Sequence, residues 1–284
     1  MAEFVEIVEM SPRDGLQNEK RPISVADKIR LVDLLSGVGF RRIEVASFVS
    51  PKWVPQMEGS DQVLAGIRRA PGVRYAALTP NLKGYEGARA ARADEVAIFA
   101  SASEGFSRTN LNCTIAESID RFRPVAEAAR ADGIPVRGYV SMVTDCPFDG
   151  PIAPASVARV VAALRDLGCH EVSLGDTVGR GMPETIDRML SAVLGELPPA
   201  RLAGHYHDTG GRALDNIEVS LARGLRVFDA SAGGLGGCPY APGAKGNVAT
   251  ERVAARLADG GFETGLDRAR LEAAAAFAVA LRAG

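Results

Sequence analysis

The pair His205 and His207 is the strongest chemical signal in this sequence of 284 residues, which contains three histidines in all. The two stand at the end of residues 202–206, a segment expected to be a β-strand. Residues i and i+2 of a strand point to the same face, so the two imidazoles would lie together, and neutral imidazole is the commonest metal ligand. We therefore predict a metal site rather than a pair of hydrogen-bonded core histidines. The third histidine, His170, precedes an expected strand and is predicted to be inert.

A second candidate group follows the first expected strand, where Arg13 and Asp14 precede a glycine. Taken alone, the pair is typical of a turn with a surface ion pair, but its position at a strand end favours a functional role. Asp14 would add an oxygen ligand to the two imidazoles. No cysteine lies beside the histidines, so a thiolate-rich zinc site is disfavoured. A mixed nitrogen and oxygen set suits Mg²⁺ or Mn²⁺, and Co²⁺, Fe²⁺ or Zn²⁺ would also fit.

A glycine-rich segment, residues 233–247, follows the last expected strand and contains Cys238 and Asn247. It lacks the Gly-Lys-Ser/Thr and GxGxxG patterns, so it does not indicate a nucleotide site. Its glycines predict a loop that can close over a site and carry in the Cys238 thiol. The other cysteines are predicted to be structural: Cys113, Cys146 and Cys169.

Two carboxylates, Glu44 and Asp176, are also expected near strand ends. Glu44 lies in the expected strand 42–46, and Asp176 follows the expected strand 171–174. A carboxylate that faces the inside of a barrel needs a partner. Arg13 is the nearest plausible cation, so we predict that both acids pair with Arg13 and hold it in place.

The elements that position these groups alternate regularly along the chain. Segments of helical periodicity separate eight strand candidates, and Ser24, Thr114 and Pro183 supply helix-start signals. The strand candidates are residues 5–8, 42–46, 73–78, 95–99, 136–140, 171–174, 202–206 and 226–229. The alternation predicts an α/β fold, a (β/α)8 TIM barrel with its chemistry at the carboxyl ends of the strands, and an open doubly wound sheet is the alternative. We expect one catalytic domain over residues 1–284, with about 265–284 as a helical C-terminal extension.

Composition and charge exclude several classes of protein. The chain has 33 basic and 35 acidic side chains, and this formal net charge of −2 excludes a polycationic surface for nucleic acid or an acidic membrane. No apolar run approaches the roughly 18 residues of a membrane helix. The N-terminus lacks the features of a signal peptide, the C-terminus carries no peroxisomal address, and unpaired cysteines are typical of a reducing compartment. We therefore predict a cytoplasmic location.

Seven motifs together resemble the 3-hydroxy-3-methylglutaryl-CoA lyase family of metal-dependent, aldolase-like TIM-barrel lyases, over about residues 4–280. The motifs occupy residues 12–19, 46–57, 78–84, 137–141, 173–177, 205–209 and 234–241. The last, Gly-Leu-Gly-Gly-Cys-Pro-Tyr-Ala, is the most specific, because related barrel synthases share the Arg-Asp-Gly and His-x-His elements but lack this loop. One departure affects the expected acyl specificity: Gly211 and Arg212 stand where an aromatic residue and a Gln are expected.

The resemblance implies roles for individual residues. The implied metal ligands are Asp14, His205, His207 and Asn247. The implied catalytic residues are Arg13, which would stabilise an enolate, the loop cysteine Cys238, Asp14, Glu44 and His205. The implied contacts to the substrate or to coenzyme A are Arg13, Gln17, Lys20, Ser47, Asn110, Ser173 and Asp176.

The implied reaction is a metal-assisted retro-Claisen cleavage of 3-hydroxy-3-methylglutaryl-CoA to acetyl-CoA and acetoacetate, as in leucine degradation. It implies a divalent cation, Mg²⁺ or Mn²⁺, an acyl-CoA substrate, and a homo-oligomer, dimeric or larger. Asp14, a histidine-linked water and the Cys238 thiolate are all candidates for the base that takes the hydroxyl proton. The alternatives are a lyase for a longer-branched 3-hydroxyglutaryl-CoA, a Claisen-condensing acyl-CoA synthase and a non-catalytic metabolite-binding barrel.

Overall fold

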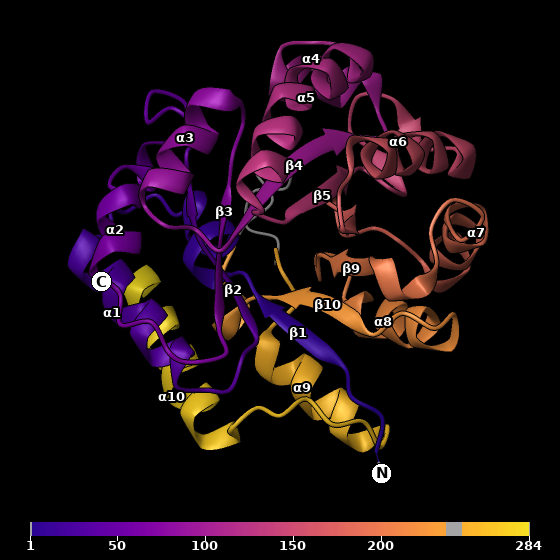
Figure 1. Cartoon of the computed structure of the whole chain (residues 1–284). Coiled ribbons are helices and arrows are strands. Elements are labelled where there is room, and N and C mark those ends of the chain that lie inside the picture. Colours follow the sequence, from indigo (N-terminus) through magenta and orange to yellow (C-terminus); the bar gives the residue numbers. More distant parts are fainter. Residues whose placement is uncertain (1, 237–245, 284) are drawn as a thin grey trace.

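The centre of the molecule is a closed barrel of eight parallel strands (Figure 1). This computed structural model describes residues 2–236 and 246–283. The strands are β1 (Glu6–Glu9), β2 (Arg42–Ser47), β3 (Arg74–Leu78), β4 (Glu95–Ser101), β5 (Val136–Ser141), β8 (Glu171–Asp176), β9 (Leu202–Tyr206) and β10 (Val227–Ala230). They follow the order β1, β10, β9, β8, β5, β4, β3, β2, and β2 pairs with β1 again. The predicted (β/α)8 barrel is therefore confirmed, and the open-sheet alternative is wrong.

Helices surround the barrel and follow its strands in turn (Figure 1). They are α1 (Val25–Ser36), α2 (Ser60–Gly66), α3 (Leu82–Ala90), α4 (Glu104–Leu111), α5 (Ile115–Asp132), α6 (Pro154–Leu167), α7 (Pro183–Val193), α8 (Ala213–Ala222), α9 (Thr250–Asp259) and α10 (Arg268–Ala283). The predicted start signals act as expected. The Ser24 hydroxyl accepts a hydrogen bond from the third residue of α1, Thr114 and Glu117 cap each other at the start of α5, and Pro183 opens α7.

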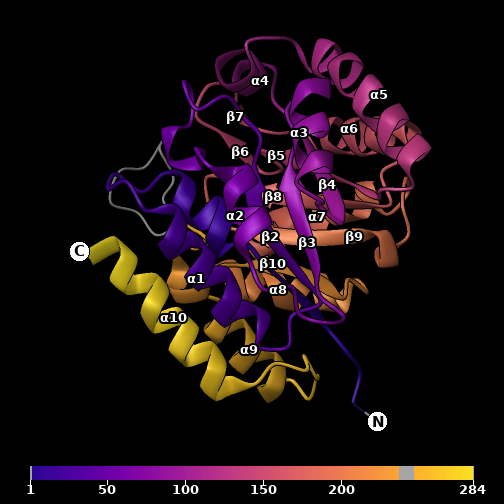
Figure 2. The same cartoon turned by 60° about the vertical axis from the view of Figure 1, so that its left-hand side comes forward.

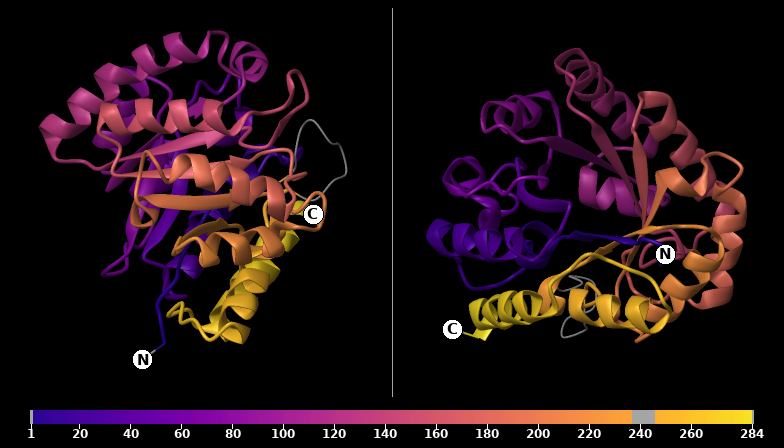
Figure 3. Two further views of the ribbon diagram at one scale, coloured as in Figure 1. Left: turned by 90° about the vertical axis from the view of Figure 1, so that its right-hand side faces the viewer. Right: turned by 60° about the horizontal axis from the view of Figure 1, so that its bottom comes forward.

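The last helix, α10, extends the barrel as predicted. It packs beside α1 (Figure 2) and along the edge of the helical ring near α9 (Figure 3). Leu271, Ala274 and Ala278 form its buried face. The small side chains of Ala274 and Ala278 let the helix lie close to its neighbours, so the alanine-rich tail is explained by packing.

Several short elements were not expected from the sequence. They are the hairpin of β6 (Asp145–Cys146) and β7 (Gly150–Pro151), the π-helical turn η1 (Ser11–Gly15), and the 3-10 turns η2 (Pro55–Met57), η3 (Pro199–Arg201) and η4 (Ala232–Gly234). The turn η1 contains Arg13 and Asp14, and single π-helical turns occur frequently at functional sites. In the part of the chain that the structure describes, none of the helices is both long and apolar enough to cross a membrane.

The inside of the barrel holds a row of buried charges, here called the barrel network: Arg42, Glu171, Arg137 and Asp229. Arg42 donates two hydrogen bonds to the Glu171 carboxylate, at 2.8 and 3.1 Å. Glu171 also accepts from Nε of Arg137 at 2.7 Å, and Nη2 of Arg137 donates to Asp229 at 2.7 Å. Each buried charge thus faces an opposite charge, which offsets the cost of its removal from water.

The amino-terminal end of the barrel contains the third histidine. Nε2 of His170 lies 3.2 Å from Oε2 of Glu95, the first residue of β4. Glu95 is also within 3.9 Å of Arg42. His170 therefore belongs to the structural end of the barrel, as predicted, and not to its mouth.

Replacement of Glu171 by Gln is expected to destabilise the fold by about 3–5 kcal/mol at neutral pH, because two buried guanidinium groups lose their shared counter-charge. Urea unfolding measures this loss. The matched control is Glu218→Gln, because Glu218 pairs with Arg256 at 2.6 Å where both side chains are about half exposed. A surface pair of this kind contributes less than about 1 kcal/mol.

The loss of stability in Glu171→Gln should also depend on pH. Burial alone would raise the pKa of Glu171, but Arg137 and Arg42 lower it to about 2, from an ordinary value of 4.5. The stabilisation is therefore complete above pH 4.5 and disappears as the pH falls toward about 2. The difference in stability between the wild type and Glu171→Gln should narrow across this window. A difference that stays constant on acidification would contradict an ionised Glu171.

Candidate metal centre and active site

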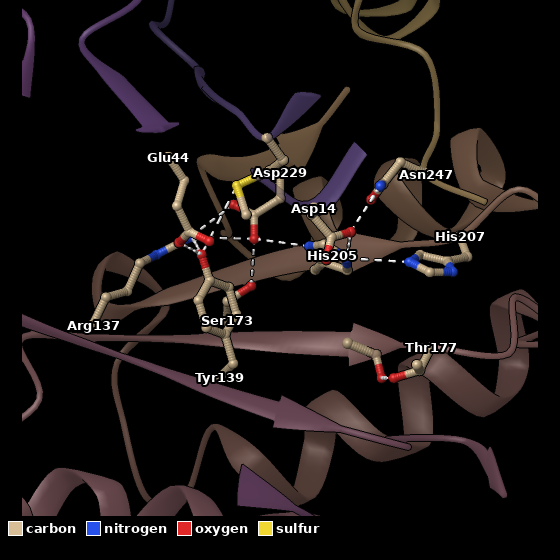
Figure 4. A network of polar contacts seen from close by, with 12 residues as sticks. Asp14, Glu44, Arg137, Tyr139, Ser173, Thr177, His205, His207, Asp229 and Asn247 are labelled. Carbon is tan, nitrogen blue, oxygen red and sulfur yellow. Dashed lines mark hydrogen bonds and ion pairs between the residues drawn. The ribbon is translucent and has the colours of Figure 1, made fainter. Parts of the chain in front are cut away.

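Three side chains from two segments of the chain meet at the carboxyl ends of the strands (Figure 4). Asp14 lies on η1 directly after β1, His205 is on β9, and His207 follows β9 in an isolated bridge with Asn247. Nε2 of His205 lies 3.3 Å from Nε2 of His207 and 3.8 Å from Oδ2 of Asp14. The structure thus brings the two predicted imidazoles and the predicted carboxylate together; this group is called the metal cluster below.

The donor atoms of the metal cluster fit a divalent cation. One ligand atom from each residue lies within 4.8 Å of the others, and within the described residues this is the one group of at least three His, Cys, Asp or Glu side chains that meets this criterion. Two Nε2 atoms that face each other can share at most one proton, so at least one lone pair points into the cluster. Two nitrogens and a carboxylate oxygen form the mixed set expected for such an ion.

Asn247 lies next to the metal cluster but turns its amide nitrogen toward Asp14. Nδ2 of Asn247 donates to Oδ2 of Asp14 at 2.8 Å and to the carbonyl oxygen of Leu235 at 3.2 Å. A cation would need the amide oxygen instead, and a half-turn of the amide group exchanges the two atoms. The role of Asn247 as a fourth ligand stays a prediction.

Electrostatics favour the cation-binding forms of Asp14 and His207. For His205, the effect of burial is outweighed by Asp229 and Asp14, which raise its pKa. Burial alone would raise the pKa of Asp14, but the Arg13 guanidinium and the two imidazoles lower it to about 2. Burial and repulsion from His205 lower the pKa of His207 to about 4. Near neutral pH, Asp14 is therefore a carboxylate and His207 a neutral imidazole, which are the forms that bind metal ions.

Asp229, on β10, orients His205 and is absent from the sequence-based prediction. Its Oδ2 accepts hydrogen bonds from Nδ1 of His205 at 3.1 Å and from the Ser173 hydroxyl at 2.8 Å (Figure 4). A bond at Nδ1 leaves Nε2 of His205 directed into the cluster. One sequence signal points to Asp229, because it is a charged residue at the end of an expected barrel strand. The structure pairs it in register with His205.

The variant Asp229→Asn is expected to weaken Mn²⁺ binding by about 10–100-fold, because the amide cannot both accept from His205 and pair with Arg137. The apoprotein is titrated with Mn²⁺, and the signal of free Mn²⁺ in electron paramagnetic resonance gives the affinity of each variant. Asp215→Asn is the matched control, since Asp215 pairs with Arg212 on the surface at 3.1 Å. Equal Mn²⁺ affinity in the two variants would show that Asp229 does not support the site.

Arg13 is buried and held on two sides. Its Nε donates to Oε1 of Glu44, and its Nη1 donates to Oδ1 of Asp14 at 2.5 Å. Glu44 is fixed in turn by the Tyr139 hydroxyl, which donates to Oε2 at 2.6 Å. Among the described residues, no acceptor contacts Nη2 of Arg13, so this nitrogen is available to a bound molecule. The predicted pairing of Glu44 with Arg13 is confirmed, and a surface ion pair is excluded.

Asp176, the last residue of β8, does not pair with Arg13, so that prediction is wrong. Its carboxylate accepts hydrogen bonds from the Thr144 hydroxyl at 2.7 Å and from the N–H of Gly181 at 2.8 Å. The reason lies in the strand order. Glu44 is on β2, which adjoins β1, whereas two strands separate β8 from β1. Asp176 instead joins the loops that follow β5 and β8.

Besides Arg13, two of the predicted substrate contacts are linked to this site, Gln17 directly and Ser173 through Asp229. Nε2 of Gln17 donates to Oδ1 of Asp14 at 3.3 Å. Ser173 reaches the site through its hydrogen bond to Asp229. Gln17 therefore adjoins the metal cluster, Ser173 lies one residue further away, and their contact with a substrate stays a prediction.

The remaining predicted contacts, Ser47, Lys20 and Asn110, form no hydrogen bond or ion pair with the metal cluster within the described residues. Ser47 is buried at the end of β2, where its hydroxyl accepts a hydrogen bond from the N–H of Val49 at 3.4 Å. Lys20 is exposed, and Asn110 is exposed on α4. Cys238 lies outside the described residues.

Two glycines let η1 lie directly against the segment that follows β10. A Cβ on Gly15 would be 2.7 Å from Oγ of Ser231 and 2.9 Å from Cβ of Leu235. Gly236 has a φ of +112°, and a Cβ there would be 2.6 Å from Nδ2 of Asn247. Any larger residue would separate Asp14 from Asn247, which explains the glycine of the Arg-Asp-Gly motif.

The departure noted at residues 211 and 212 lies outside the metal cluster. Arg212 is about half exposed, and its guanidinium pairs with Asp215 at 3.1 Å at the start of α8. Gly211 has a φ of +70° in the preceding turn. The extra positive charge therefore faces solvent and does not change the charge of the cluster.

The fold and the site together define a class of protein, a TIM-barrel enzyme with a buried arginine beside a candidate cation site at the strand ends. The family model HMGL-like matches residues 4–278, and the chain belongs to this family.

Proteins of known name are similar over nearly the whole chain. A 3-hydroxy-3-isohexenylglutaryl-CoA/hydroxy-methylglutaryl-CoA lyase of Pseudomonas aeruginosa is 59% identical over 93% of this chain and 88% of its own length. A hydroxymethylglutaryl-CoA lyase of Pseudomonas mevalonii is 52% identical over 98% of this chain and 92% of its own. The crystal structure of an HMG-CoA lyase from Brucella melitensis has a TM-score of 0.99 and 65% identity, and covers 100% of both chains.

Proposed function

We propose that this chain is a hydroxymethylglutaryl-CoA lyase, which cleaves 3-hydroxy-3-methylglutaryl-CoA to acetyl-CoA and acetoacetate. The observation that carries the proposal is the hydrogen bond between Arg13 and Asp14, because it places a permanent cation beside the candidate metal ligands. The names of the three similar proteins support the assignment. The proposed cofactor is a divalent cation, Mg²⁺ or Mn²⁺.

The proposed reaction breaks one carbon–carbon bond. The tertiary hydroxyl loses its proton, its oxygen becomes the ketone oxygen of acetoacetate, and the bond between C2 and C3 breaks. The electron pair of that bond passes to the thioester as an enolate, and a proton then adds to C2 to give acetyl-CoA. The site must therefore favour loss of the hydroxyl proton, stabilise the enolate oxygen and supply a proton.

Arg13 meets the second requirement. A guanidinium stays charged at any working pH, so it cannot lose its proton to the enolate. Glu44 and Asp14 fix Nε and Nη1, and this leaves Nη2 to donate a hydrogen bond to the thioester oxygen. A donor held in place before the reaction stabilises developing negative charge without reorganising.

Asp14, His205 and His207, with Asn247 as the fourth ligand, would hold the cation. When bound, it supplies Lewis acidity toward the hydroxyl and carboxylate oxygens of the substrate. The thiol of Cys238 is the proposed donor of the proton to C2. This last role rests on the sequence alone, because Cys238 lies outside the described residues.

A second candidate function is cleavage of longer-branched 3-hydroxyglutaryl-CoA substrates. It is favoured by the name of the P. aeruginosa relative, which includes 3-hydroxy-3-isohexenylglutaryl-CoA at 59% identity. Both substrates carry the same hydroxyl, carboxylate and thioester, so the same residues would act on either. They differ in the alkyl group on C3 alone.

The purified protein, supplied with Mg²⁺, should release acetoacetate from 3-hydroxy-3-methylglutaryl-CoA. The ratio of kcat/KM for the methyl and isohexenyl substrates decides between the two functions. A Claisen-condensing synthase would instead consume an acyl-CoA and form a carbon–carbon bond. Failure to cleave either substrate with metal bound would contradict the assignment as a lyase of this type.

The proposal includes the setting of the enzyme. We propose one catalytic domain over residues 1–284, a cytoplasmic location, a role in leucine degradation and assembly into a dimer or larger homo-oligomer. The formal net charge of −2 argues against a nucleic acid as a partner. Size-exclusion chromatography with light scattering measures the oligomeric state.

A further inference from the structure

Glu9, the last residue of β1, is a fully buried carboxylate that the proposed mechanism does not use. Its Oε1 accepts hydrogen bonds from the N–H groups of Ser11 and Ala232, both at 2.9 Å. Its Oε2 accepts from the Thr250 hydroxyl at 2.7 Å. Among the described residues, Glu9 forms no ion pair, so these three donors offset part of the loss of its hydration, and burial still raises its pKa.

The three donors belong to three segments that carry the proposed site. Ser11 opens η1, which contains Arg13 and Asp14. Ala232 opens η4 directly after β10, and Thr250 is the first residue of α9. Three segments therefore meet at Glu9, and this meeting point is called the junction below. The first segment, η1, carries Asp14. The other two are η4 and the start of α9.

Backbone contacts extend this junction to Asn247. The N–H of Ser231 donates to the carbonyl of Val248 at 3.0 Å, and the N–H of Thr250 donates to the carbonyl of Ser231 at 3.1 Å. Asn247 lies three residues before Thr250 and donates to Asp14 at 2.8 Å. The path from Glu9 through Thr250 to Asn247 thus ends at the same carboxylate as the path from Glu9 through η1.

We infer that Glu9 is a positioning residue, which sets the distance between Asp14 and Asn247 by joining η1 to the start of α9. The inference rests on the proposed function in one respect, because the distance matters only if Asp14 and Asn247 both bind the cation. The junction itself rests on the hydrogen bonds alone. A carboxylate suits the task because it accepts from two backbone N–H groups and a hydroxyl at once. An aliphatic side chain would leave those donors buried without partners.

Thr250→Val is the sharpest test, because loss of the whole Glu9 side chain would leave a cavity that could prevent folding. This variant removes one of the three hydrogen bonds and keeps the shape of the side chain. Thr250→Ser should restore the bond and the wild-type properties. Thr79→Val is the matched control: Thr79 is equally buried, and its hydroxyl donates to the carbonyl of Ala97 at 3.1 Å, away from the junction.

The measurements are the Mn²⁺ affinity of the apoprotein, the melting temperature and kcat. We expect Thr250→Val to lose about 10-fold in Mn²⁺ affinity and in kcat, as for other residues that support a metal site. Thr79→Val should lose a similar amount of thermal stability and keep the affinity for Mn²⁺. Equal Mn²⁺ affinity in the two valine variants, or no recovery in Thr250→Ser, would overturn the inference.

The Mn²⁺ titration also separates this inference from the proposed function. It contains no acyl-CoA, so its outcome does not depend on which substrate the enzyme cleaves. A protein that binds Mn²⁺ but cleaves no 3-hydroxyacyl-CoA would contradict the function and still test the role of Glu9.

Discussion

Treatment of the purified protein with a chelator is expected to abolish cleavage of 3-hydroxy-3-methylglutaryl-CoA, and added Mg²⁺ or Mn²⁺ is expected to restore it. The physical reason is the convergence of Asp14, His205 and His207, whose ligand atoms lie within 4.8 Å of one another. Arg13 alone would have to balance the charges of substrate and enolate without a cation. Acetoacetate release, measured before and after metal addition, gives the result.

Substitutions of single histidines test whether the required metal binds at the metal cluster. His207→Ala should lose metal binding and turnover together. His170→Ala is the matched control, because His170 contacts Glu95 at the opposite end of the barrel. Full turnover in chelated protein, or equal turnover in the two alanine variants, would exclude a metal at this cluster.

Arg13→Lys is expected to lower kcat by about 10²–10³-fold, the usual cost of losing an electrostatic donor. An ammonium cannot bond to Glu44 and Asp14 and still direct a third nitrogen at a thioester oxygen, as the planar guanidinium does. Arg13→Met should be little worse than Arg13→Lys. Steady-state kinetics with metal at saturation measures both losses.

Two controls accompany the Arg13 variants. Arg68→Lys changes a guanidinium that pairs with Asp33 on an exposed surface and should leave kcat unchanged. Circular dichroism should show folded protein in each case. Near-wild-type turnover in folded Arg13→Lys would mean that Arg13 serves only as the partner of Glu44.

Most of the fold can be predicted from the hydrophobic periodicity of the sequence. The eight strands could be located because short apolar segments alternate with helical ones, and Thr114 and Glu117 form a capping box that any reader of the sequence can recognise. The barrel then brought distant strand ends together, so Asp14 and His205 could be placed at one mouth although 190 residues of chain separate them. The proximity of Asp14 and His205 thus follows from the barrel topology and not from a local sequence pattern.

The interaction partners of the charged residues are harder to predict from the sequence than their positions at the strand ends. The sequence places Glu44 and Asp176 near strand ends in the same way, but only Glu44 is on a strand adjacent to β1, so only Glu44 reaches Arg13. The role of Asp229 cannot be assigned from its own sequence position, because it depends on contacts with His205 and Arg137, which are on other strands. The π-helical turn at η1 has no signature of spacing that would distinguish it from an ordinary turn.

The barrel network has a consequence for how this sequence can change over evolutionary time. Arg42 and Arg137 share the carboxylate of Glu171, Arg42 also pairs with Glu6, and Arg137 also pairs with Asp229, so loss of one member changes the charge balance around the others. An aliphatic residue between strand and helix can be exchanged for one of similar volume in a single step. Inside the barrel, by contrast, an exchange of one charged member disturbs its partners on other strands, so the substitution histories of these strands should be coupled to one another. Double-mutant cycles between Arg137 and Glu171 would measure that coupling directly.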